Sequence, residues 1–113
     1  MDMTDAVFET LADPVRRRLL DVLRGGERSV GDLVAAVPIR QSGVSRHLGI
    51  LERNGFVQAR RDGQRRLYSL RPEPFRELEG WAAAYRAHWE ARLDRLTAAL
   101  EARADPDPEE PAG

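Results

Sequence analysis

The chain has 113 residues, no cysteine, and 18 basic residues against 19 acidic ones, for a formal net charge of −1. That length fits one domain, the lack of cysteine excludes disulfides and thiolate metal ligands within it, and the charge balance excludes a simple polycation. The charge is nevertheless segregated, because residues 40–71 hold eight Arg against only Glu52 and Asp62. A local basic patch of this kind is typical of nucleic-acid binding.

The amino-terminal stretch MDMTDAVFE is acidic, and the longest unbroken apolar run is WAAAY. A signal peptide begins with basic residues before a longer apolar segment, and a membrane-spanning helix needs about 20 apolar residues. The sequence therefore predicts a cytoplasmic protein without a membrane partner.

Three helices are expected in the first part of the chain. A short one runs through Leu11, and the Asp-Pro pair at 13–14 is an N-cap followed by a proline at the first position of the second helix. The glycine pair at 25–26 ends that helix. Residues 29–32, Ser-Val-Gly-Asp, resemble a capping box with Asp in place of the usual Glu or Gln, and open a third helix that Pro38 stops.

The next stretch, RQSGVSRHLGILERN, predicts a fourth helix that ends at the following glycine. At about 100° per residue, Val44, Leu48 and Leu51 form one apolar stripe, while the opposite face is small and cationic. Gly49 on that face costs about 1 kcal/mol of helix stability relative to Ala, which either a close approach to DNA or the loss of a former side chain would explain. The candidates for DNA contact on this helix are Arg40, Gln41, Ser42, Ser45, Arg46, His47 and Arg53.

These residues have different expected roles. The helix start near Gln41 and Ser42 offers unpaired backbone N–H groups to a phosphate, and Gln41 suits either an adenine or the backbone. Arg46 is expected to contact guanine, because its fork pairs with two acceptors, and Arg53 is expected to meet phosphate. His47 lies beside the apolar stripe, where we favour packing beneath the helix over a phosphate contact.

Residues 56–70 predict a β-hairpin, because two β-prone runs flank the Asp-Gly pair at 62–63. A two-residue turn there places Arg60 opposite Arg65, and like charges across a hairpin are destabilising. A phosphate between them would relieve the repulsion, whereas a solvated, charge-rich hairpin is the alternative interpretation. The residues predicted to contact phosphate are Arg60, Arg61, Arg65 and Arg66.

A long helix is expected from about Pro74 to Arg103, with aromatic residues and leucines three or four apart. Packing onto the first helices is one explanation, but the apolar stripe exceeds what an exposed helix tolerates. We therefore predict pairing with a second copy in a symmetric homodimer. The predicted interface comprises Phe8, Leu11, Leu78, Trp81, Tyr85, Trp89, Leu93 and Leu96. The domain spans residues 1–103, and the acidic, proline-rich residues 104–113 are predicted to be disordered.

This order of elements predicts a mostly α fold with a two-stranded β wing, namely a winged helix-turn-helix with a long C-terminal dimerisation helix. The expected partner is double-stranded DNA, and a dimer would read a pseudo-palindrome with half-sites about one helical turn apart.

Three segments together, LADPVRRRLLDVLRGGERSVGDLV, QSGVSRHLGILERNGFV and RRDGQRRLYSL, resemble the ArsR/SmtB family of bacterial winged-helix repressors. The resemblance covers roughly residues 5–100. It implies a homodimer, joined through its first and last helices, that represses transcription by binding operator DNA. The ending GWAAAYRAHWEARLDRL is similar to a branch of the family not usually regarded as metal sensing.

The resemblance also bears on metal binding. One family site uses cysteines in a Cys-x-Cys-Asp-like stretch, where this chain has Ser-Val-Gly-Asp at 29–32. Another uses Asp, His and Glu along the final helix, where this chain has a single His, His88, with no Asp or Glu three or four positions away. A site completed by Glu77, Glu90 or Asp94 of a second chain stays open. The resemblance therefore implies no metal and no cofactor. The family's usual Lys or Arg near the middle of the reading helix is also replaced, by a glycine.

Two other functions fit parts of the sequence. A metal- or small-molecule-responsive repressor would share the fold, and a protein-interaction module would use the aromatic helix without any role for the basic face. Two isolated histidines, with no cysteine and no Gly-rich phosphate loop, predict no catalytic residues and hence no enzyme.

Overall fold

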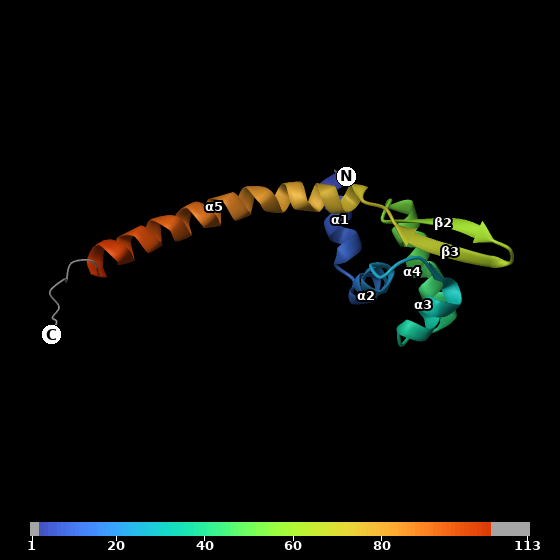
Figure 1. Cartoon of the computed structure of the whole chain (residues 1–113). Coiled ribbons are helices and arrows are strands. Elements are labelled where there is room, and N and C mark those ends of the chain that lie inside the picture. Colours follow the sequence, from blue (N-terminus) through green and yellow to red (C-terminus); the bar gives the residue numbers. More distant parts are fainter. Residues whose placement is uncertain (1–2, 105–113) are drawn as a thin grey trace, which may run out of the picture. The chain divides into compact units, whose positions relative to one another are not determined.

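The computed structural model describes residues 3–104. Its elements are α1 (Met3–Leu11), α2 (Pro14–Leu23), β1 (Arg28–Ser29), α3 (Val30–Ala36), α4 (Gln41–Arg53), β2 (Val57–Asp62), β3 (Arg65–Leu70) and α5 (Glu73–Ala104), as Figure 1 shows. The chain divides into two compact units, one ending at Glu79 and the other beginning at Gly80. The predicted long helix is confirmed within one residue at each end, and the tail residues 105–113 lie outside the described residues.

The predicted helix caps at Asp13 and Ser29 are confirmed. Asp13 Oδ1 accepts hydrogen bonds from the backbone N–H groups of Val15 (2.8 Å) and Arg16 (3.3 Å), and a proline opens α2. In the capping box, the Ser29 N–H donates to Asp32 Oδ2 (3.1 Å), and the Asp32 N–H donates to Ser29 Oγ (3.2 Å). These caps satisfy N–H groups that helices leave unpaired, so α2 and α3 begin where local chemistry requires.

The sheet of the wing has three strands rather than the predicted two. All are antiparallel in the order β1-β3-β2, and the two-residue β1 pairs Arg28 with Tyr68 and Ser29 with Leu67. A strand of two residues is too short to show an alternating pattern, so no sequence pattern predicts β1.

The hairpin is confirmed, but its predicted turn is wrong by one residue. Asp62 pairs with Arg65, so the turn residues are Gly63 and Gln64. Gly63 has a φ of 66°, and two-residue hairpins favour a glycine with positive φ at the first turn position. Arg60 therefore lies opposite Leu67, not opposite Arg65.

The core of the first unit gathers side chains from α2, α3, α4 and the sheet. The predicted stripe of Val44, Leu48 and Leu51 is confirmed, since all three are fully buried. The start of α5 joins the same core, where the ring of Phe75 meets that of Phe56 edge-on with centroids 5.4 Å apart. Burial of this stripe fixes which face of α4 points outward.

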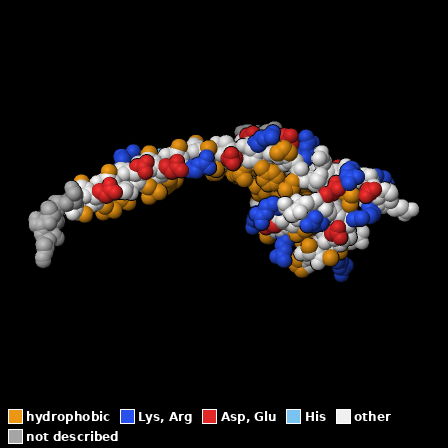
Figure 2. Space-filling model, viewed as in Figure 1, with side chains coloured by type: hydrophobic (Ala, Val, Ile, Leu, Met, Phe, Trp, Pro, Cys, Tyr) orange, Lys and Arg blue, Asp and Glu red, His pale blue; other side chains and the backbone are white. Residues whose placement is uncertain are grey.

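The second unit begins at Gly80 and comprises helix α5 up to Ala104. Its large apolar side chains are about half exposed, and Figure 2 shows them as an orange row along one side. They are Trp81, Tyr85, Trp89, Leu93, Leu96 and Leu100, with exposed fractions from 46% to 56%. Within residues 3–104, no helix combines the length and apolarity required to cross a membrane.

Candidate nucleic-acid interface

The outward face of α4 is polar and open to solvent. Its predicted contact residues other than His47 are all exposed: Arg40, Gln41, Ser42, Ser45, Arg46 and Arg53. Arg40 is the N-cap, and its side chain makes no capping hydrogen bond. The first N–H groups of α4 consequently receive no side-chain acceptor at the cap, which suits an incoming anion.

A groove brings the start of α4 together with one strand of the wing. It has a volume of about 430 Å³. Its lining residues are Ser29, Val30, Gly31, Gln41, Ser45, Gln64, Arg65, Arg66 and Tyr68. The structure thus unites Gln41 and Ser45 with two of the four predicted wing arginines.

Arg60, which is also predicted to contact phosphate, does not line this groove. Its Nε and Nη2 donate to the two carboxylate oxygens of Glu27, at 2.9 Å and 2.8 Å. These hydrogen bonds lower the pKa of Glu27 and raise the pKa of Arg60. A bidentate pair of this type neutralises the guanidinium, so its predicted contact with phosphate is opposed by an acid of its own chain.

The other wing arginines differ in their partners. Arg66 Nε donates to the Tyr68 hydroxyl (3.0 Å), and its Nη2 reaches the Glu52 carboxylate at 3.4 and 3.5 Å. Arg61 and Arg65 are exposed and form no ion pair within 4 Å among residues 3–104. Arg61 and Arg65 are therefore the wing cations with most freedom to bind an anion.

His47 is buried, with 5% of its surface exposed. Its ring nitrogens lie near two guanidinium groups, with Nδ1 3.3 Å from Arg16 Nη1 and Nε2 3.3 Å from Arg46 Nη2. Burial lowers the pKa of His47; the Asp13 carboxylate raises it, and the two arginines lower it further. The burial agrees with packing beneath the helix, the favoured interpretation of this residue.

The predicted dimer residues fall into two groups. Leu11 and Leu78 are partly buried and pack against the core of the first unit, so they offer little surface to another chain. Phe8 is exposed, as are the predicted residues of the second unit.

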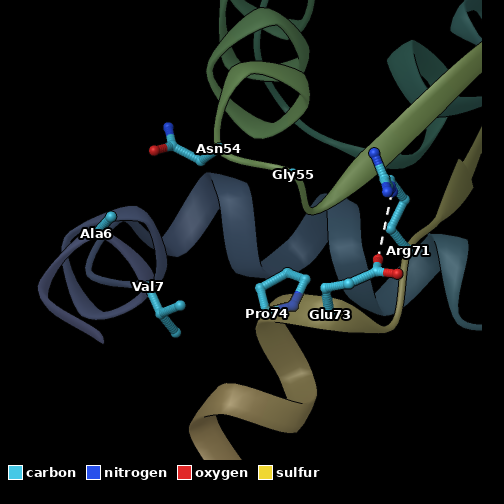
Figure 3. A pocket seen from close by; sticks show the side chains of 7 residues that line it. All are labelled: Ala6, Val7, Asn54, Gly55, Arg71, Glu73 and Pro74. Atoms are coloured by element: carbon cyan, nitrogen blue, oxygen red, sulfur yellow. Dashed lines mark ion pairs between the residues drawn. The ribbon is translucent and has the colours of Figure 1, made fainter. Parts of the chain in front are cut away.

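A second hollow in the first unit has a volume of about 150 Å³ and is shown in Figure 3. It is lined by Ala6, Val7, Asn54, Gly55, Arg71, Glu73 and Pro74. Its two charged side chains pair with each other, Arg71 Nε lying 3.3 Å from Glu73 Oε1. Across residues 3–104, no three His, Cys, Asp or Glu side chains are grouped so as to hold a metal ion.

Sequence reasoning missed two residues of this region, Arg16 and Glu27. Arg16 contacts His47 of α4, and Glu27 binds a wing arginine 33 positions away. Both contacts join residues distant in the chain, and neither residue stands in a local pattern that distinguishes it from its charged neighbours.

Comparison with known proteins gives several relatives. Over 72 residues the chain is 44% identical to an uncharacterized HTH-type transcriptional regulator, Rv0081 of Mycobacterium tuberculosis, a stretch covering 63% of each chain. It is 35% identical to the transcriptional repressor SdpR of Bacillus subtilis, covering 66% of this chain and 83% of SdpR. It is 38% identical to a probable mercury resistance operon repressor of Streptomyces lividans, covering 85% and 77%. The match thus spans less than two thirds of the length of Rv0081.

Comparison with solved structures finds proteins of the same kind. The crystal structure of an ArsR family transcriptional regulator superposes with a TM-score of 0.71 at 29% identity, covering 79% of this chain and 98% of that one. The homodimeric winged helix-turn-helix DNA-binding domain of Mb0332 from Mycobacterium bovis, a possible ArsR-family regulator, gives 0.62 at 30% identity, covering 80% and 84%.

The arrangement of α3, α4 and the β2–β3 hairpin defines a winged helix-turn-helix protein, and a model of a helix-turn-helix domain matches residues 11–58. The chain belongs to the ArsR/SmtB family of transcriptional regulators. This is a family of DNA-binding regulators and not of enzymes.

Proposed function

We propose that this chain is a homodimeric repressor that binds a pseudo-palindromic operator, with α4 in the major groove, and that it needs no metal to do so. The observation that carries the proposal is the exposed, small and cationic start of α4, backed by a fully buried apolar stripe. Burial of that stripe fixes the helix in its unit while leaving the polar face accessible. A reading helix contacts base edges mainly from its N-terminal residues.

Individual contacts follow from side-chain chemistry. Arg46 is exposed and reads guanine through two donors. Gln41 and Ser42, at the uncapped helix start, contact phosphate, and Gln41 also suits adenine. Arg53, nearer the C-terminal end of α4, contacts the DNA backbone, as do Arg61 and Arg65 of the wing.

The homodimer is supported by the second unit. Its six large apolar side chains are about half exposed along one side of α5. A stripe of this extent marks an interaction surface, and a second copy of the chain provides the matching stripe by symmetry. Mb0332 is described as a homodimeric winged helix-turn-helix DNA-binding domain.

Independence from metal is supported by the ligands that this chain lacks. Soft metals favour thiolates, and the 113 residues contain no cysteine. The resistance named for the mercury relative is therefore not carried over to this chain. The alternative is a repressor of the same fold that responds to another metal or to a small molecule.

The experiment is a titration of fluorescently labelled duplex DNA from upstream of the protein's own gene, with an unrelated duplex as the control. We expect tighter binding to the upstream duplex, weakening with salt because phosphate contacts release counterions, and no change on adding a chelator. Equal affinity for both duplexes would contradict sequence-specific recognition and favour an interaction module. Loss of binding on chelation, or release only with added metal, would favour the metal-responsive alternative.

A further inference from the structure

An ion pair joins the segment before β1 to the outer strand β2 of the wing sheet. The middle strand of that sheet is β3, with β1 on one side and β2 on the other. Glu27 immediately precedes β1 and Arg60 lies in β2, so the pair between them spans β3. It is therefore a contact between the first part of the chain and the wing.

The pair is well formed although it lies at the surface. Arg60 donates to both oxygens of the carboxylate, from Nε at 2.9 Å and from Nη2 at 2.8 Å, which is the bidentate geometry of strong charge-assisted hydrogen bonds. The Arg60 side chain is nevertheless 59% exposed, and that of Glu27 is 32% exposed. A phosphate that reaches this guanidinium therefore has to compete with the carboxylate.

Two further charges act on the pair. The hydrogen bonds from Arg60 lower the pKa of Glu27 most, and the charge of Arg65 lowers it further. Glu27 in turn raises the pKa of Arg60, to which Asp62 adds a weaker electrostatic contribution. Among residues 3–104, Asp62 forms no ion pair with Arg60 within 4 Å. Glu27 is therefore the acid that holds Arg60, and its charge also acts on a second wing arginine.

The pair adds little to the attachment of the wing. Exposed ion pairs contribute little to stability, and β3 is already joined to β2 along an antiparallel register from Val57↔Leu70 to Asp62↔Arg65. Bracing of the wing is therefore a weak explanation of Glu27. Its charge matters more for DNA, because binding to phosphates depends on how many of them the cations of a protein neutralise.

We propose that Glu27 competes with DNA phosphate for Arg60, and so limits the number of phosphates that the wing binds. The carboxylate belongs to the same chain and already lies at hydrogen-bond distance, so a phosphate has to displace it. Without the charge of Glu27, Arg60 is free to contact a phosphate, and that contact forms on DNA of any sequence. The proposal rests on the proposed binding of DNA by α4 and the wing, and adds an acid that opposes it.

The test is the salt dependence of DNA binding, measured on the upstream duplex and on the unrelated one. Glu27→Gln removes the charge and keeps the shape of the side chain. We expect the slope of log affinity against log salt to become steeper by about 1 on both duplexes, because one more phosphate is contacted. Glu27→Gln combined with Arg60→Ala should return to the wild-type slope. An unchanged slope in Glu27→Gln would overturn the proposal, as would a double variant that stays steeper than the wild type.

Asp21→Asn is the matched control. Asp21 is exposed on α2 and forms no ion pair within 4 Å among residues 3–104. Its substitution removes the same charge without freeing a wing arginine, so we expect the wild-type slope. An increase as large as that of Glu27→Gln would reduce the effect to net charge and refute the proposal. Weaker DNA binding by Glu27→Gln, with a lower free energy of unfolding, would also refute it and assign the pair to bracing the wing.

Failure of the proposed function gives a different result. If the wild-type chain shows no preference for upstream DNA, sequence-specific recognition fails, while the slopes on the unrelated duplex still test Glu27. If the chain binds neither duplex, ¹H–¹⁵N NMR follows the Arg60 Nε–H group during addition of inorganic phosphate, and Arg60→Ala identifies its signal. We expect phosphate to shift this signal in Glu27→Gln and not in the wild type. Equal shifts in the two proteins would contradict the competition.

Discussion

At the scale of single residues, the interface depends on which arginines are already occupied. Arg60 is neutralised by Glu27 through two hydrogen bonds, whereas Arg65 has no ion pair among residues 3–104. The side chain of Arg16 is mostly buried and already contacts backbone carbonyls and a histidine of its own unit. Charge counted along the sequence therefore overstates the charge that is available to DNA.

The buried ring of His47 predicts a dependence of stability on pH. Because burial lowers its pKa in the folded state, the unfolded chain takes up a proton first as the pH falls through the ordinary value of 6.5. The free energy of unfolding should therefore be highest above pH 6.5 and should decrease as the pH falls below it. Urea unfolding across this range checks the prediction. His47→Gln, which does not titrate, should flatten the dependence, and an unchanged profile in that variant would assign the dependence to other groups.

At the scale of elements, local signals predicted most of the fold. The side chains of Asp13 and Ser29 accept hydrogen bonds from backbone N–H groups two or three residues away. Short sequence patterns therefore suffice to predict these N-caps. The stripe of α4 follows from helical spacing alone.

One error of prediction is local, in the turn of the hairpin, and another concerns a contact between distant residues. The Asp-Gly pair marks a hairpin, but glycine fits either turn position, and the pairing of Asp62 with Arg65 became clear only in the sheet. The contact of Glu27 with Arg60 requires knowing that β1 lies beside β3. Sequence alone therefore predicted helix α4 and its buried stripe, but not the ion pair that Arg60 forms with Glu27.

The glycine in the middle of α4 gives a prediction at this scale. A Cβ at Gly49 would lie 3.4 Å from Arg53 Nη1, the end of a flexible side chain. Gly49→Ala should therefore stabilise the free protein by about 1 kcal/mol, measured by urea unfolding. Gly55→Ala is the matched control, because its φ of 77° strains any side chain, and it should destabilise. Destabilisation by Gly49→Ala would reveal a packing constraint that the geometry does not contain.

The wing arginines give a prediction for the salt dependence of DNA binding. Arg65→Ala should reduce the slope of log affinity against log salt by about 1, because one phosphate contact is lost. Arg60→Ala should leave the slope unchanged, since Glu27 already neutralises that side chain. Binding titrations at several salt concentrations measure both, and equal slopes for the two variants would refute the distinction.

At the scale of the whole molecule, the two units have separate tasks in our account. The first unit presents the reading helix and wing, and the second presents an apolar stripe on α5. The family places the chain among transcriptional regulators. Two copies joined through their stripes would present two reading helices to one pseudo-palindromic site.

The apolar stripe on α5 predicts which substitution disrupts the proposed dimer. Trp89→Asp places a charge within it and should dissociate the dimer, because burying an unpaired carboxylate is unfavourable. Ala87→Asp is the matched control, because it places the same charge about 160° around the helix. Sedimentation velocity distinguishes the species, and circular dichroism verifies that α5 remains helical. An intact dimer in Trp89→Asp would exclude this interface.

The most direct test of the central claim, that the outward face of α4 reads duplex DNA, is the affinity of Arg46→Ala for upstream DNA relative to an unrelated duplex. We predict a loss of about 1–3 kcal/mol on the upstream duplex, with preference relaxed at one base pair, and little loss on the unrelated duplex. A uniform loss on both would assign Arg46 to phosphate. Unchanged affinity on both would contradict the account.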